Sequence, residues 1–316
     1  HELAWLGQYG VKSVEGNEPV DRDTLFEAAS MSKPMFAYVV LQLAQEGRLD
    51  LDRPLVEYLG EPYANADPRH DRITARMVLT HTSGFPNWRP GGWRAGGPLP
   101  VHFEPGTAQR YSGEGFLFLQ RVVEKTTGTP LATLMRRRLL DPLGLRLSGY
   151  VWRDEWAANA AAGHTREGRL PKEKRSLYHT ANAAFTLYTT PAEYASFLIE
   201  MMRPERDAAH SLKREWLAAM MMPHPVANKG TVQAEGDEED GVVRYGLGWR
   251  VEESSAGLRV FHSGSNRTGF RCYAEFYPET GDGLVIMTNA VGGRALWMEL
   301  TKQLHEQNWT RRRASR

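Results

Sequence analysis

The sequence contains a single cysteine, Cys272, among its 316 residues. One cysteine excludes an intrachain disulfide. It also weakens the case for a thiolate metal site, because structural zinc sites usually combine several cysteine and histidine ligands. Cys272 falls within residues 270–276, which alternate like a strand, so we interpret it as a small buried residue. The sequence therefore predicts neither a metal nor a disulfide framework.

Long apolar runs are missing as well. No stretch approaches the ~18 consecutive apolar residues that would suggest a membrane-spanning helix, so no membrane span is expected. The printed chain begins with His1 and shows no secretory signal peptide. The residues alone leave the compartment open.

An excess of charge of one sign is also absent. The 39 basic and 38 acidic side chains give a formal net charge of +1, which provides no general attraction for nucleic acid. The tight basic clusters at residues 136–138 and 311–313 and the acidic run at residues 235–240 are interpreted as solvated surface. We expect a small-molecule substrate and no nucleic-acid partner.

The composition is that of a globular protein, with 41% hydrophobic and 24% charged residues. Strand-like patterns occupy residues 4–14, 258–262, 272–277 and 284–288, and the last three predict an antiparallel meander. Helical spacing marks residues 30–47, 191–202, 212–222 and 293–307. We predict an α+β fold, an antiparallel sheet flanked by helices. Residues 1–47 and 177–316 would form a discontinuous sheet domain around an inserted, mainly helical domain, 48–176, with the site in the cleft between them.

Ser30 and Lys33 form the one Ser-x-x-Lys pattern of the chain. Pro34 is tolerated only in the first turn of a helix, so the helix is expected to begin close to Ser30. Residues i and i+3 of a helix share a face, which brings an amine near the hydroxyl. The alternative is a capping serine with an exposed lysine, since roughly one such match is expected by chance. Motifs of other catalytic sites, such as Gly-x-Ser-x-Gly and His-Glu-x-x-His, are absent.

Six motifs in order resemble the serine β-lactamase and penicillin-binding superfamily, with class C β-lactamases, D-alanyl-D-alanine carboxypeptidases, D-aminopeptidases and family VIII carboxylesterases as the most similar branch. The resemblance covers about residues 5–305. The motifs occupy residues 24–34, 79–84, 104–113, 142–145, 245–249 and 262–264.

The resemblance implies a β-lactamase/transpeptidase-like fold and assigns roles to several residues. Ser30 matches the acylated nucleophile, and Lys33 matches the lysine that accepts or relays its proton. Tyr111 matches the proton-shuttling tyrosine of the second motif. His262 stands where many relatives have the lysine of Lys-Thr-Gly, and the N–H groups of Ser30 and Ser265 would form the oxyanion hole. No cofactor is implied.

Lys33 needs help if it is to act as a base at neutral pH. An ordinary lysine pKa near 10.4 would have to fall by about three units, or roughly 4 kcal/mol. We expect Tyr111 and His262 to share this task. As a hypothesis, His262 contributes hydrogen bonding, and positive charge only at lower pH, to hold a substrate carboxylate or orient Tyr111.

Further residues are expected around the substrate. They are Gly113, Ser263, Gly264, Asn266, Arg267 and Trp88, the last with Trp93 and Phe85 either lining an acyl pocket or packing in the core. Arg271 is a further candidate for a substrate carboxylate, and His81 and Ser83 are expected to be structural. Most relatives have an asparagine at the position of Gly113, whose amide contacts the substrate. Glycine cannot do this, which favours simple esters over β-lactams or peptides.

Several alternatives remain open. Tyr63 and Asn65 form a rival Tyr-x-Asn pattern, although they follow Lys33 too closely and lack a preceding Pro-Gly turn. We expect a serine hydrolase that forms a covalent acyl-enzyme on carboxylic esters or D-amino-acid amides. A class C-like β-lactamase, a non-catalytic scaffold and, least favoured, a zinc hydrolase are the alternatives. Relatives have one more strand before residues 4–14, so the sheet is expected to lack one strand unless that strand lies outside this chain. The oligomeric state is open, and the resemblance slightly favours an exported or periplasmic protein.

Overall fold

The computed structural model describes residues 2–64, 67–95, 97–203, 211–224, 244–254 and 257–306. Its main sheet is antiparallel, with strands in the order β3-β4-β5-β6-β7. The strands are β3 (Arg244–Tyr245), β4 (Arg250–Ser254), β5 (Gly257–Ser265), β6 (Arg271–Tyr277) and β7 (Asp282–Thr288). The meander predicted from the C-terminal third is confirmed, whereas β3 and β4 were not predicted.

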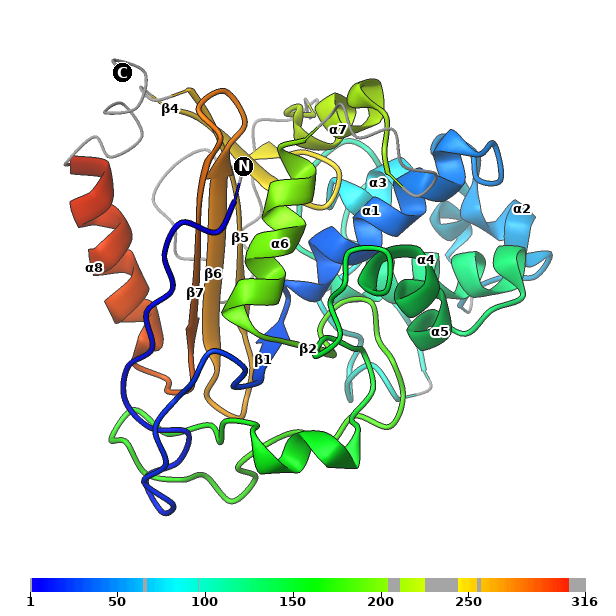
Figure 1. The fold of residues 1–316 in the computed structure, drawn as a ribbon. Coiled ribbons are helices and arrows are strands. Elements are labelled where there is room, and N and C mark those ends of the chain that lie inside the picture. Colours follow the sequence, from blue (N-terminus) through cyan, green and yellow to red (C-terminus); the bar gives the residue numbers. More distant parts are fainter. Residues whose placement is uncertain are drawn as a thin grey trace.

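Helices cover both faces of this sheet. Helix α8 (Gly293–Glu306) lies on one face, where the Trp297 ring stacks on Tyr273 with centroids 4.5 Å apart. Helix α6 (Pro191–Met201) lies on the other face, next to the helical part of the molecule (Figure 1). The apolar spacing at residues 191–202, 212–222 and 293–307 is thus confirmed by α6, α7 (Arg214–Met221) and α8, except for residue 307, which lies outside the described residues.

The helical part surrounds the long buried helix α1 (Ser32–Gln45), and every residue from Ser32 to Leu43 is buried. Pro34 lies in its first turn, as expected. The other helical elements are α2 (Leu55–Leu59), η1 (Pro68–Arg72), α3 (Ala75–Leu79), α4 (Gly113–Thr127), α5 (Leu131–Met135), the π-helix η2 (Arg136–Leu140) and η3 (Asp154–Ala158). The α+β class is confirmed, and the division into two domains stays a prediction.

A second, two-stranded sheet was not anticipated. Strand β1 (Phe26–Ala29) pairs with β2 (Leu187–Thr189), with an irregularity between Glu27 and Ala29. All of its residues are buried, because β1 packs against the main sheet on its way to α1. This small sheet brings the start of α1 next to β5.

The strand predicted at residues 4–14 is wrong. Apart from a single bridge between Val11 and Pro19, this segment forms no ladder in the part of the chain that the structure describes. Trp5 and Tyr9 are 69% and 79% exposed. The alternating apolar residues of this segment are therefore not buried against a core, as those of a strand would be. Strand β7 is therefore an edge of the described sheet.

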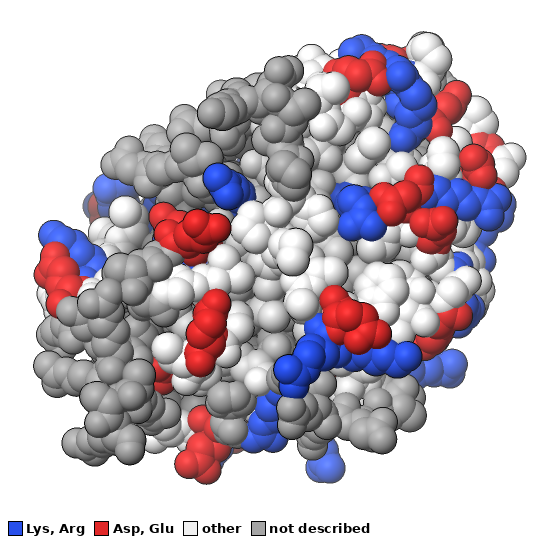
Figure 2. Space-filling model, turned by 90° about the horizontal axis from the view of Figure 1, so that it is seen from above, with Lys and Arg blue, Asp and Glu red and all other residues white. Residues whose placement is uncertain are grey.

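Charged side chains of both signs share the surface. On the face seen from above in Figure 2, acidic and basic residues are interspersed among uncharged ones. Arg138 and Arg136 of the predicted basic cluster pair with Glu46 and Asp141, and the clusters at 235–240 and 311–313 lie outside the described residues. None of the helices described is long and apolar enough to cross a bilayer.

Candidate active site

Ser30 lies in the sharp turn between β1 and α1. Ala29, the residue before it, has a left-handed backbone (φ 48°), which is unfavourable for a residue with a Cβ atom. The turn is held by Met31 N donating to Ala28 O at 3.1 Å and by the Ser32 hydroxyl donating to Ala29 O at 2.6 Å. Ser30 itself is partly exposed, whereas Ser32 and Lys33 are buried. The turn therefore leaves the Ser30 side chain partly exposed to solvent, while the residues that follow it lie in the core.

Lys33 reaches the nucleophile from the first turn of α1. Its Nζ donates to Ser30 Oγ at 3.3 Å and to the Ala184 carbonyl at 2.9 Å, although the side chain is only 1% exposed. The Tyr111 ring centroid lies 4.5 Å from Nζ. The capping-serine alternative, with a solvent-exposed lysine, does not fit this geometry.

Tyr111 is placed by the loop that leads into α4. The neighbouring Ser112 caps this helix by accepting a hydrogen bond from Gly115 N, and Ser112 N donates to Nδ1 of His81 at 3.0 Å. The His81 ring lies 4.5 Å from the Tyr111 ring and is itself 1% exposed. Burial and the nearby charge of Lys33 keep the pKa of His81 well below its ordinary value, so the ring is neutral with its proton on Nε2. His81 thus packs against the Tyr111 ring and accepts a hydrogen bond from the backbone of the next residue.

His262 lies on β5, with its ring centroid 6.5 Å from that of Tyr111. Its Nδ1 donates to the Ser263 carbonyl at 2.8 Å, which leaves Nε2 as a buried acceptor with no hydrogen-bond partner among the described residues. Burial, followed by the charges of Arg250 and Lys33, lowers the pKa of His262 well below its ordinary value. The neutral ring can accept a hydrogen bond, but it does not supply the positive charge of a lysine at this position.

Strand β5 passes unusually close to β1 at Gly264. A Cβ atom on Gly264 would lie 2.1 Å from the Ala28 carbonyl oxygen, so only glycine fits there. The next residue, Ser265, ends β5 and is exposed. This close approach brings together the segments that carry the two expected oxyanion residues, Ser30 and Ser265, which are 235 residues apart in the sequence.

The turn after Ser265 is held by a buried carboxylate that sequence reasoning missed. Glu27, only 2% exposed, accepts hydrogen bonds from Asn266 Nδ2 at 2.6 Å, Thr268 Oγ1 at 3.1 Å and Ser176 N at 2.7 Å. The other end of the Asn266 amide accepts from Phe270 N. This geometry favours a role for Asn266 in holding the turn instead of contacting substrate. Glu27 belongs to the first motif, but nothing in its local sequence indicates this partner.

Of the other predicted substrate contacts, some side chains are exposed and others are bonded within the protein. Arg267 is exposed and Ser263 is partly exposed, whereas the Arg271 guanidinium donates to the carbonyls of Asn266 and Phe270. Of the aromatic residues, Phe85 is fully buried in the core. Trp88 and Trp93 are partly exposed and contact Phe185.

Gly113 opens α4, and Trp88 fills the space beside it. A Cβ atom on Gly113 would lie 2.5 Å from the Trp88 ring and 3.0 Å from the Asn87 carbonyl oxygen. The Gly113 N–H donates to Asn87 at 3.0 Å. The space that a side chain at position 113 would need is therefore occupied by an indole ring.

The rival residue Tyr63 lies elsewhere. Its ring stacks on Phe118 at 4.2 Å and is buried in the helical core, while Asn65 lies outside the described residues. Among the residues described, no cluster of His, Cys, Asp and Glu could hold a metal ion. Burial raises the pKa of the Cys272 thiol to about 12, which makes it an unreactive core residue.

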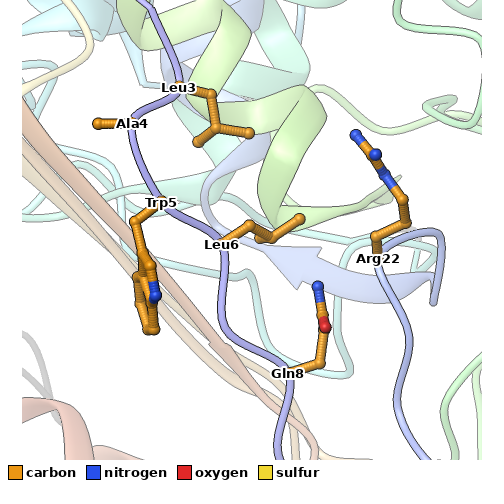
Figure 3. Close-up of a pocket in the computed structure, with 6 residues that line it drawn as sticks. All are labelled: Leu3, Ala4, Trp5, Leu6, Gln8 and Arg22. Carbon is orange, nitrogen blue, oxygen red and sulfur yellow. The ribbon is translucent and has the colours of Figure 1, made fainter.

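A hollow on the surface lies along the N-terminal segment, and Figure 3 shows its lining residues, Leu3, Ala4, Trp5, Leu6, Gln8 and Arg22. None of them is a residue of the candidate site. The side chains carry no nucleophile beside a base, so the hollow offers no chemistry of its own.

Known proteins resemble this chain in sequence and in fold. Esterase EstB of Burkholderia gladioli is 32% identical over 175 residues, which cover 48% of this chain and 44% of that protein. Protein flp of Staphylococcus aureus (strain MRSA252) is 24% identical over 300 residues, covering 89% and 56%. The chain thus spans about half the length of these relatives. A D-alanine carboxypeptidase AmpC from Burkholderia cenocepacia has the same fold, with a TM-score of 0.72, 21% identity and coverage of 90% and 85%.

The family assignment rests on a match over nearly the whole chain. The sequence model of the Beta-lactamase family matches residues 2–307, which include all the motifs that position Ser30, Lys33, Tyr111 and His262. The chain therefore belongs to the Beta-lactamase family.

Proposed function

We propose that this protein is a serine hydrolase that cleaves carboxylic esters through a covalent ester on Ser30. The observation that carries the proposal is the contact between Ser30 Oγ and Lys33 Nζ at 3.3 Å, in a strained turn and beside the Tyr111 ring. A partly exposed hydroxyl within reach of a buried amine is the arrangement that nucleophilic catalysis requires.

The residues divide the reaction into two steps. Acylation requires Lys33 in its amine form, after it has released its own proton. Ser30 Oγ then bonds to the carbonyl carbon while its proton passes to Lys33, directly or through Tyr111. The bond to the leaving alcohol then breaks, and the alcohol oxygen takes that proton. In deacylation, water attacks the same carbon, the Ser30 ester bond breaks, and Ser30 regains its proton as the carboxylic acid leaves. The N–H groups of Ser30 and Ser265 would stabilise the oxyanion in both steps.

Two features favour esters over amides and β-lactams. The Trp88 ring stands where an amide side chain would contact the substrate, because Gly113 has no side chain and the indole fills the space. The neutral His262 cannot offer a cation to a substrate carboxylate. Esters need neither contact, since they are more reactive than amides. The 32% identity with a protein named as an esterase supports this choice.

The proposal is tested with p-nitrophenyl acetate and intact-mass spectrometry. The wild-type protein should hydrolyse the ester and form an acyl adduct during turnover. Ser30→Ala should lose at least about a thousandfold in kcat/KM and form no adduct. Tyr111→Phe should lose about a hundredfold or more, since it removes one proton-transfer group but keeps the ring against His81.

Ser196→Ala, on a partly exposed position of α6, is the matched control and should behave as the wild type. Benzylpenicillin serves as the competing substrate. Turnover of penicillin at a rate similar to that of the ester would replace the ester proposal with a β-lactamase. An inert wild-type protein that forms no adduct with either compound would indicate a non-catalytic scaffold.

A further inference from the structure

Four partly exposed aromatic side chains form a group that takes no part in the two chemical steps proposed above. We call Trp88, Trp93, Tyr178 and Phe185 the ring cluster. Phe185 lies at its centre, in edge-to-face contact with Trp88, Trp93 and Tyr178 at centroid distances of 5.4, 5.7 and 5.3 Å. All four are partly exposed, unlike the fully buried Phe85, Phe116 and Phe118 of the neighbouring core.

The ring cluster borders the candidate active site on two sides. Phe185 directly follows Ala184, whose carbonyl accepts a hydrogen bond from Lys33 Nζ at 2.9 Å. Trp88 fills the space beside Gly113, two residues after Tyr111, since a Cβ atom on Gly113 would lie 2.5 Å from the Trp88 ring. The ring cluster thus belongs to the two segments that contact Lys33 and follow Tyr111.

Both loops that carry the rings are anchored by buried polar contacts. On one side, the Arg89 guanidinium forms a two-pronged ion pair with Glu114, at 2.9 and 2.8 Å, and Glu114 is 0% exposed. On the other, Asn182 Oδ1 accepts from Ala184 N at 2.8 Å, and Gln120 Oε1 accepts from Ala183 N at 2.9 Å. The rings are thus held in place before any ligand arrives, which lowers the entropic cost of binding.

We propose that the ring cluster binds an apolar, ring-sized group of the ester substrate and so determines its specificity. This inference rests on the proposed ester hydrolysis. Edge-to-face aromatic groups favour flat apolar ligands, and partly exposed rings gain most when a ligand covers them. The group can belong to the acid or to the alcohol, and these two sources are separated by experiment.

The test compares substrates that differ in one group. On the acid side, p-nitrophenyl phenylacetate is compared with p-nitrophenyl acetate. On the alcohol side, benzyl acetate is compared with ethyl acetate. The wild type should prefer the ring-bearing member of at least one pair by about tenfold or more in kcat/KM, and the pair that shows the preference identifies the source.

Trp88→Ala and Phe185→Ala should each reduce that preference by about tenfold. Trp88→Phe should retain most of it. Trp216→Ala, a partly buried tryptophan on α7, is the control and should leave the ratio unchanged. Because each ratio is taken within one variant, loss of active protein cancels.

No ring preference in either pair, or a preference that survives both substitutions, would overturn the inference. If the proposed function itself fails, no ester will be hydrolysed in a Ser30-dependent manner, including p-nitrophenyl acetate.

Discussion

The carboxylate of Glu27 and the side-chain amide of Asn266 form a hydrogen bond of 2.6 Å. Glu27 lies three residues before Ser30 on β1, and Asn266 directly follows Ser265 at the end of β5. This one contact therefore links the two segments that carry the expected oxyanion donors. The carboxylate, which is 2% exposed, holds their relative position from inside the core.

Removal of this carboxylate should lower kcat. In Glu27→Ala, Asn266, Thr268 and Ser176 lose their common acceptor, so the turn after Ser265 becomes less well placed. Oxyanion contacts strengthen in the transition state, so we expect kcat for p-nitrophenyl acetate to fall about tenfold to a hundredfold with little change in KM. Glu27→Gln keeps one acceptor oxygen, so its kcat should lie between those of the wild type and Glu27→Ala. An unchanged kcat, or a rise in KM alone, would contradict the positioning role.

The same residue predicts how stability depends on pH. Burial raises the pKa of Glu27 from 4.5 to about 7. The folded state therefore binds its proton more tightly than the unfolded state, and the stability this provides is complete below pH 4.5 and lost as the pH rises through about 7. The loss is of the order of 3 kcal/mol. The free energy of unfolding in urea should fall less between about pH 5 and 8 in Glu27→Gln than in the wild type. Parallel pH profiles of the two proteins would rule out this titration.

His262 should respond to pH in the opposite direction. Its pKa is lowered well below the ordinary 6.5, so the folded ring stays neutral where the unfolded one takes up a proton. Its contribution to stability is present above about pH 6.5 and is lost as the pH falls. The ring resonances of His262 should not titrate between about pH 6 and 8 in NMR spectra.

His262→Lys tests whether this neutral acceptor acts on Tyr111. The new amine would lie near the charges of Arg250 and Lys33, which already act on His262. We therefore expect the pH profile of kcat to shift. An unchanged profile would show that the group at position 262 has no influence on the proton-transfer residues.

Gly264→Ala should separate the two strands that meet at the site. The new Cβ would lie 2.1 Å from the Ala28 carbonyl, and neither backbone can move without disturbing β1 or β5. We expect a loss of stability of about 2 kcal/mol or more and a loss of kcat that exceeds the loss of folded protein. Gly292→Ala is the control, because no atom lies within 4 Å of the place that its new methyl group would take. Wild-type kinetics in Gly264→Ala would contradict the close approach of the strands.

Local patterns predicted the parts of the molecule that depend on local chemistry. Pro34 and the spacing of Ser30 and Lys33 placed the start of α1, and alternation placed three strands of the sheet. Contacts between distant segments were not predictable, since Glu27 and Asn266 are 239 residues apart and neither has an unusual neighbourhood. At residues 4–14 the sequence predicted an element that the structure lacks, because the alternating pattern there does not form a strand. Alternation predicts a strand only where one face of the segment is buried, and here Trp5 and Tyr9 are both exposed.

The space beside Gly113 provides the last prediction, which concerns substrate choice. Gly113→Asn alone should impair ester hydrolysis, because its Cβ would lie 2.5 Å from the Trp88 ring and 3.0 Å from the Asn87 carbonyl. In the double variant Gly113→Asn with Trp88→Ala, the ring is gone and its space is open to the new amide. A site with a polar donor in place of an apolar ring favours substrates with an amide. We therefore expect the ratio of benzylpenicillin to p-nitrophenyl acetate hydrolysis to rise about tenfold or more in the double variant, relative to Trp88→Ala alone. Comparison with Trp88→Ala isolates the effect of the asparagine from that of the lost indole. If the ratio stays the same, the missing amide at position 113 does not limit β-lactam turnover, and the neutral His262 becomes the remaining explanation for a preference for esters.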